Sequence, residues 1–107
     1  MKFLTISKVT DAAALCPPAA MRAMLEATVA WMDAQKKSGK LIEAYAIPGG
    51  RVVAICEHPT ADDLAQTIAS MPIGAFMNHE VYALADIGTT MKVIIENVKQ
   101  AEQLVKK

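Results

Sequence analysis

The sequence predicts an α+β fold, in which a four-stranded antiparallel sheet carries helices on one face. Apolar residues alternate with a period of two in four short segments, which is typical of strands. They recur at intervals of three and four in three longer segments, which indicates amphipathic helices. The order is strand, helix, strand, strand, helix, strand, helix. Its first six elements are the βαββαβ arrangement of a ferredoxin-like domain.

Length and composition limit the class of protein. The 107 residues predict a single domain, 1–107, and 53% of them are hydrophobic. Apolar surface that remains after one core is filled favours self-association. Eleven basic and eleven acidic residues balance, so neither nucleic acid nor an anionic membrane is an expected partner. No apolar run is long enough to span a bilayer, and polar residues interrupt any signal core, so we expect a cytoplasmic protein.

The first strand and helix come from residues 2–8 and from the segment that starts at Pro17. In the strand, Phe3 and Ser7 share a face, and Leu4 and Ile6 share the other. Two prolines suit the first turn of a helix, where a missing N–H costs nothing. The helix that follows carries an apolar stripe, formed by Met21, Met24, Leu25, Thr28, Trp31 and Met32.

Two strands, at 41–47 and 51–57, are joined by Pro48-Gly49-Gly50 in a predicted hairpin. The loop holds two residues or three, and this choice sets the register. With two, Glu43 and Tyr45 share a face with Ala54 and Cys56. With three, they share it with Val53 and Ile55. Both alternatives are compatible with the sequence.

The second helix and the fourth strand follow from residues 60–84. Thr60 is the expected N-cap, with Asp62 and Asp63 in the first turn, where the helix dipole favours carboxylates. Pro72 and Gly74 end this helix. From Phe76 the period changes to two. One face then carries Asn78, Glu80 and Tyr82, and the other carries Met77, His79 and Val81.

A known family resembles this part of the chain. The motif is Met71-Pro72-Ile73, followed by Phe76-Met77-Asn78-His79-Glu80-Val81 and Leu84. It is similar to the second helix, proline break and last strand of the muconolactone isomerase family, in the dimeric α+β barrel superfamily. The resemblance implies that two sheets pair face to face in a dimer. It also implies a proton shift on a small unsaturated lactone acid, without cofactor or metal, with Glu80 and the strand around Met77 as the positions that carry over.

A last helix is predicted from about residue 86 to the C-terminus, with Asp86 as its cap. Its apolar residues are spaced four, three, four, three, four, as in a coiled-coil seam; they are Ile87, Met91, Ile94, Val98, Ala101 and Val105. Such a stripe must be buried, either on the chain's own sheet or on a partner chain.

The candidate chemistry rests on a few polar side chains of the strands. Glu80 and His79 are the candidate catalytic bases, and as adjacent strand residues they face opposite sides of the sheet. The candidate substrate-binding residues have polar side chains that can line a pocket and orient a carbonyl or carboxylate; they are Tyr82, Asn78, Tyr45, Glu43 and Arg51.

Each of these residues also has a structural interpretation. His79 fits a partly buried histidine that bonds a neighbouring strand, and the Glu80 face fits a solvated or interface-lining surface. We interpret His58 as a loop residue and Cys56 as a small core residue. The histidine and cysteine spacing gives no metal site, and we expect no cofactor.

Two classes of function therefore remain. The first is an enzyme, a cofactor-free isomerase on a small lactone or organic acid. The second is a non-catalytic oligomeric module that binds a small ligand or only assembles. Both have the same expected partners, namely other copies of the chain, as a homodimer or higher homo-oligomer, and a small molecule.

Overall fold

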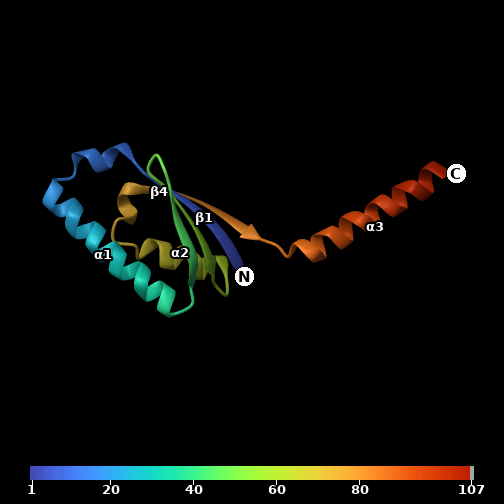
Figure 1. Cartoon of the computed structure of the whole chain (residues 1–107), viewed down its shortest axis with the longest axis horizontal. Helices are drawn as coiled ribbons and strands as arrows, with labels where there is room; N and C mark the ends of the chain where they lie inside the picture. The colour runs from blue at the N-terminus through green and yellow to red at the C-terminus, as the bar shows by residue number, and fades with distance from the viewer. Residues whose placement is uncertain (107) are drawn as a thin grey trace.

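The computed structural model describes residues 1–106 and has a sheet with two helices on one face and a third helix that projects from it (Figure 1). The elements are β1 (Lys2–Val9), α1 (Pro18–Lys37), β2 (Leu41–Ile47), β3 (Arg51–Glu57), α2 (Ala61–Ala69), β4 (Met77–Leu84) and α3 (Ile87–Lys106), with short 3-10 helices at Asp11–Leu15 and Gly74–Phe76. The strands lie in the order β2-β3-β1-β4, and all their pairings are antiparallel. This arrangement confirms the predicted ferredoxin-like α+β fold.

The core lies between the sheet and the helices α1 and α2. Phe3 of β1, Leu41 of β2, Cys56 of β3 and Leu64 of α2 form one buried cluster. Around it pack Met32, Ala44, Ala54 and Ile68. Alternate residues of each strand reach this cluster because successive side chains of a strand point to opposite faces.

The hairpin between β2 and β3 has the longer of the two predicted loops. Ile47 pairs with Arg51, so three residues form the turn. Gly49 and Gly50 have φ angles of 104° and 89°, which residues with a side chain rarely adopt. The register therefore places Tyr45 opposite Val53.

A β-bulge in β2 was not predicted. Leu41 pairs with Cys56, but Glu43 pairs with Ile55, so Ile42 is an extra residue in the strand. The bulge lets Leu41 point into the core while Glu43, two residues later, points to the other face. We call this other face, turned away from α1 and α2, the open face of the sheet.

Local signals fix α2 as predicted. The Thr60 hydroxyl accepts a hydrogen bond from the Asp63 backbone N–H at 3.1 Å, which satisfies one free donor of the first turn. At the other end, the Trp31 indole N–H of α1 donates to the Ser70 hydroxyl at 2.9 Å. This bond ties the two helices together beside the core.

The helix α3 lies away from the sheet of its own chain (Figure 1). Asp86 caps it, because its carboxylate accepts from the Thr89 backbone N–H at 2.8 Å. Every described residue of α3 is exposed. The alternative in which this helix covers its own sheet is therefore not what the structure shows.

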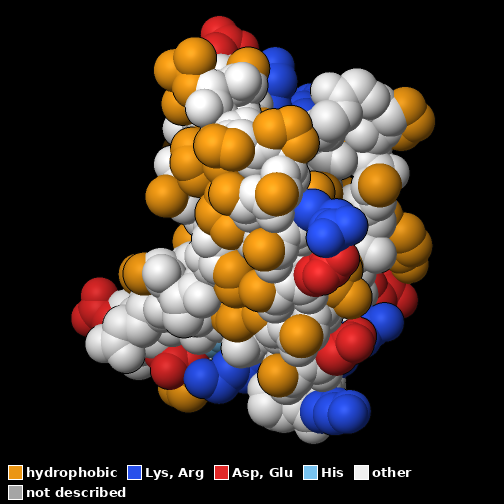
Figure 2. Space-filling view, turned by 90° about the vertical axis from the view of Figure 1, so that its left-hand side faces the viewer, with side chains coloured by type: hydrophobic (Ala, Val, Ile, Leu, Met, Phe, Trp, Pro, Cys, Tyr) orange, Lys and Arg blue, Asp and Glu red, His pale blue; other side chains and the backbone are white. Residues whose placement is uncertain are grey.

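Hydrophobic side chains also reach the surface elsewhere. Figure 2 faces the side on which α1 lies and shows them gathered over much of that face. Leu15, Leu25 and Val29 are among the exposed large hydrophobic residues of this part of the chain. Within residues 1–106, none of the helices has the length and hydropathy needed to cross a membrane.

Candidate functional site

A cavity of about 110 Å³ lies between the helix-facing side of the sheet and the helices α1 and α2. Much of its wall is apolar, with Trp31, Met32, Leu64, Ile68 and Met71. Its polar lining includes Thr5, Ser7, Gln35, Lys40, His58 and His79. This volume would hold several water molecules or part of a small organic ligand.

His79 reaches the cavity because β4 pairs with β1, which sets it opposite Ser7. Its Nδ1 atom lies 2.7 Å from the Ser7 hydroxyl oxygen, so the two side chains share a hydrogen bond. Its Nε2 atom is buried and has no hydrogen-bond partner among the described residues. Burial lowers the pKa of His79, because the charged imidazolium loses water.

These observations give His79 the properties of a general base. With a lowered pKa, the ring is neutral near pH 7 and able to accept a proton. When Nδ1–H donates to Ser7, the lone pair of Nε2 is the free basic site. A buried polar atom without a partner is uncommon in folded proteins and marks a place where a ligand or water binds.

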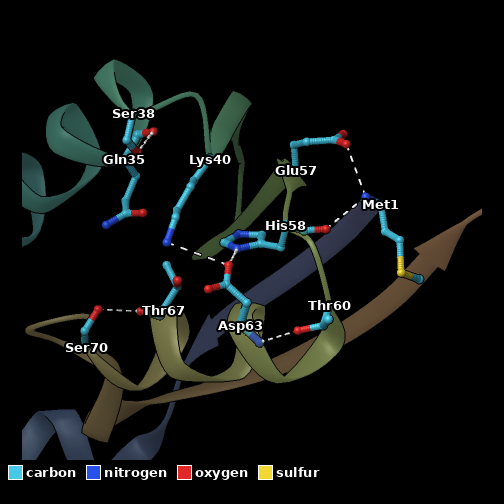
Figure 3. Close-up of polar contacts among 10 residues, drawn as sticks. All are labelled: Met1, Gln35, Ser38, Lys40, Glu57, His58, Thr60, Asp63, Thr67 and Ser70. Carbon is cyan, nitrogen blue, oxygen red and sulfur yellow. Dashed lines mark hydrogen bonds and ion pairs between the residues drawn. The ribbon is translucent and has the colours of Figure 1, made fainter.

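A second group of polar side chains, formed by His58, Asp63 and Lys40, borders the cavity (Figure 3). The His58 side chain is buried, and its Nδ1 lies 2.7 Å from a carboxylate oxygen of Asp63. Lys40 Nζ lies 3.7 Å from the same oxygen. The pKa of Asp63 is lowered, first by the hydrogen bond from His58 and then by the charge of Lys40.

The Ser7–His79 pair and the group around His58 lie far apart along the strands. The Ser7 and His79 pair is level with Val52 of β3, six residues before His58. Six residues of strand span about 20 Å. His58 and His79 therefore do not act on the same atom of a small ligand.

Gln35 also lines the cavity, and its amide oxygen is buried and has no partner within residues 1–106. Cys56 lines the same cavity, and burial raises the pKa of its thiol. A thiol kept protonated in this way is a weak nucleophile, which agrees with the interpretation of Cys56 as a core residue. Within the described chain, no three histidine, cysteine or acidic side chains gather as metal ligands.

The other predicted site residues lie on the open face rather than in the cavity. Glu80 and Tyr82 pair with Ile6 and Leu4 of β1, on the face opposite to His79. The Tyr82 hydroxyl donates to Glu80 Oε2 at 2.8 Å. This bond to the carboxylate raises the pKa of Tyr82, and the Glu80 charge adds to the effect.

The open face also carries the remaining candidates. Lys8 of β1 pairs with Asn78 of β4 on one side and with Arg51 of β3 on the other. Glu43 of β2 pairs with Ile55 of β3. Tyr45 is 59% exposed. The structure thus collects six of the seven predicted residues on one face of the sheet and places only His79 at the cavity.

Sequence reasoning missed the partners of the two histidines. Ser7 and His79 are 72 residues apart in the chain, and only the strand register brings them together. His58 lies in a loop as interpreted, but its ring is buried against Asp63. The usable signal was the polar pair Thr5 and Ser7 on the strand face that also carries Phe3.

The fold places the chain in the class of small α+β proteins in which two helices cover one face of a ferredoxin-like sheet. The model of one family in this class, muconolactone delta-isomerase, matches residues 1–90. The chain therefore belongs to the muconolactone delta-isomerase family. Among curated proteins, none matches the chain.

Two solved structures share the fold. The crystal structure of muconolactone isomerase has a TM-score of 0.71 and 19% identity, and covers 80% of this chain and 90% of its own. A 5-chloro-2-hydroxyhydroquinone dehydrochlorinase from Burkholderia phenoliruptrix AC1100, in complex with 2,5-dihydroxybenzoquinone, has a TM-score of 0.53 and 14% identity. It covers 79% of this chain and 94% of its own. At these identities the likeness establishes the α+β barrel fold and leaves the reaction open.

Proposed function

We propose that the chain is a cofactor-free isomerase that moves a proton on a small unsaturated lactone or organic acid bound in the cavity. One observation carries the proposal: His79 lines the cavity, and its buried Nε2 atom has no partner among the described residues. Membership of the muconolactone delta-isomerase family supports the reaction class. The dehydrochlorinase that binds a dihydroxybenzoquinone supports small oxygenated molecules as ligands of this fold.

The proposed reaction needs no group beyond the substrate and the protein. His79 Nε2 takes a proton from the carbon next to the substrate carbonyl, and the electron pair of that C–H bond spreads into the conjugated system. The proton then returns from the imidazolium to a more distant carbon, which moves the double bond. Ser7 holds the ring in place through Nδ1. The base ends the cycle unchanged, and no atom is gained or lost.

The test measures turnover of muconolactone by the full chain and its variants. His79→Gln should lower kcat/KM by about 100-fold or more, the usual contribution of a positioned general base. Ser7→Ala should lower kcat more than it raises KM, because the ring loses its orienting bond. Glu96→Gln, on the exposed side of α3, is the control and should match the unmodified chain. Equal activity of the His79→Gln variant would rule out His79 as the base.

Glu80 is the competing base, and it needs a different environment. It is exposed on the open face in a single chain, so it could meet a substrate only in a space between paired sheets. Asn78, Tyr82, Tyr45, Glu43 and Arg51 would then be its neighbours. A loss of activity in Glu80→Gln, together with full activity in His79→Gln, would favour this second site.

A non-catalytic ligand-binding role is the second candidate function. The apolar part of the cavity wall favours it, because aliphatic and methionine side chains bind small molecules without polarising them. Under this alternative, muconolactone or a hydroxylated benzoquinone would bind and shift the NMR signals of Met32 and Ile68. The bound compound itself would not be converted to a product. Turnover of either compound would exclude it.

We also propose that the chain works as a homodimer or higher homo-oligomer in which open faces pair. Leu4, Ile6, Val53 and Ile55 lie on this face, and the apolar side chains of Tyr45 and Tyr82 extend it. A sheet face this apolar is normally covered in a folded protein. A cytoplasmic location remains part of the proposal and rests on the sequence alone.

A further inference from the structure

The helix α3 offers an apolar stripe that no other part of residues 1–106 covers. The family model ends at residue 90, so most of this helix lies beyond the family's matched region. Its seam residues are exposed, with Ile87 at 77%, Ile94 at 46%, Val98 at 53% and Val105 at 87%. Most of the stability of a helix in a protein comes from packing of its apolar face, so burial of the seam would stabilise α3.

We propose that α3 pairs with α3 of a second copy, in antiparallel orientation. The spacing of four, three, four, three, four from Ile87 to Val105 is that of a seam between two helices. The three lysines at 92, 99 and 106 repeat every seven residues in a row outside this seam. No charged residue occupies a seam position, so nothing in the seam repels an identical helix.

An antiparallel register, symmetric about residue 96, matches the sizes of the side chains. It sets Met91 opposite Ala101 of the second copy, Ile94 opposite Val98, and Ile87 opposite Val105. Each layer then joins a larger residue to a smaller one, which fills the space evenly. The contact is the same in both directions, as a two-fold symmetric dimer requires.

Charge at the helix ends also favours this orientation. Asp86 lies at the start of α3 and Lys106 at its end, so each would lie next to its opposite in the second copy. The two helix dipoles would run in opposite directions, which is favourable for neighbouring helices. A parallel pair would instead place the two Lys106 side chains together and the two Asp86 side chains together.

The same charges argue against a membrane surface as the occupant. Glu96 and Glu102 lie between Lys92, Lys99 and Lys106 and offset part of their charge, whereas helices that bind membrane surfaces have a polar face rich in lysine and arginine. The short link at Ala85 and the Asp86 cap hold α3 beyond the end of β4. Two paired helices would therefore keep the two sheets at opposite ends, about 30 Å of helix apart.

Matched variants of the full chain test the pairing, with mass measured by sedimentation velocity at equal concentration. Val98→Lys places a charge in the seam, and Gln100→Lys places the same charge outside it. The first should lower the mass of the assembly by half or more, and the second should leave it unchanged. An unmodified chain that sediments as a monomer, or equal masses for both variants, would overturn the proposal.

Spin labels on the full chain test the orientation. In a Cys16→Ser background, whose remaining cysteine is buried, single labels are placed at Asn97→Cys and Gln103→Cys. An antiparallel pair sets the two labels at 97 about 3 Å apart along the axis and those at 103 about 21 Å apart. Short distances at both sites would indicate a parallel pair, and no dipolar coupling would indicate no pair; either result contradicts the proposal.

Discussion

The neutral ring of His79 couples the stability of the protein to pH. Burial lowers the pKa of His79 in the folded chain, whereas the unfolded chain titrates this ring near its usual value of about 6.5. Between the two pKa values the unfolded state binds more protons. The stability that comes from burying the neutral ring is therefore complete above about pH 6.5, and it is lost as pH falls through the folded pKa.

This linkage predicts how the free energy of unfolding changes with pH. Between pH 7.5 and pH 5, urea unfolding of the native chain should show decreasing stability, and the His79→Gln variant should show a smaller decrease. His58 is present in both proteins, so the difference between them reports on His79. The carboxyl of Asp63, whose pKa is lowered, loses its contribution only in a more acidic range. Parallel curves for the two proteins would contradict this prediction.

The limits of the sequence are clear at single residues. Alternation along the fourth strand correctly set His79 and Glu80 on opposite faces, because side-chain direction is a local property of a strand. The Ser7 partner of His79 and the Asp63 partner of His58 depend on which segments meet in space. No periodicity within one segment contains that information.

At the scale of elements, the cap of α2 is a local feature with a measurable effect. Thr60→Ala removes the acceptor of the Asp63 N–H bond, and such a loss costs about 1 kcal/mol of stability. The same bond holds Asp63 in place beside His58, so the NMR signals of the His58 ring should also shift. Thr60→Ser keeps the acceptor and should retain most of the stability. Equal stability of the alanine variant would show that the cap is not needed.

The ends of elements that carry capping or turn residues were predicted well, whereas the hairpin register and the bulge, which depend on strand pairing, were not. Thr60, the Pro72 break and the Asp86 cap each act within one turn of chain, so the ends of α2 and the start of α3 follow from the sequence. The hairpin left two registers open because both loop lengths suit Pro48-Gly49-Gly50. The bulge at Ile42 appears only when β2 is paired with β3.

For the whole molecule, two separate surfaces are candidates for assembly, and they should act independently. The open face of the sheet and the seam of α3 share no residues. Ile55→Lys, in the middle of the open face, should disrupt the pairing of sheets and leave the α3 pair intact. The control is Gln66→Lys on the exposed side of α2.

Sedimentation can resolve the two contacts. The Ile55→Lys variant should retain a dimer, and a double variant that also carries Val98→Lys should be a monomer at the same concentration. Because residues without shared partners contribute additively, each change should remove one step of assembly. A monomer from Ile55→Lys alone would indicate that the two surfaces belong to one interface.

The alternation of β4 has a consequence for how such a protein can diversify. Neighbouring codons of this one strand specify side chains that never meet, since His79 and Glu80 are separated by the thickness of the sheet. Evolution can therefore change the residues at 77, 79 and 81, and with them the chemistry of the enclosed space. The residues at 78, 80 and 82 can change separately and alter which partner the other face binds. One stretch of eight residues thus allows two traits to be inherited and modified separately.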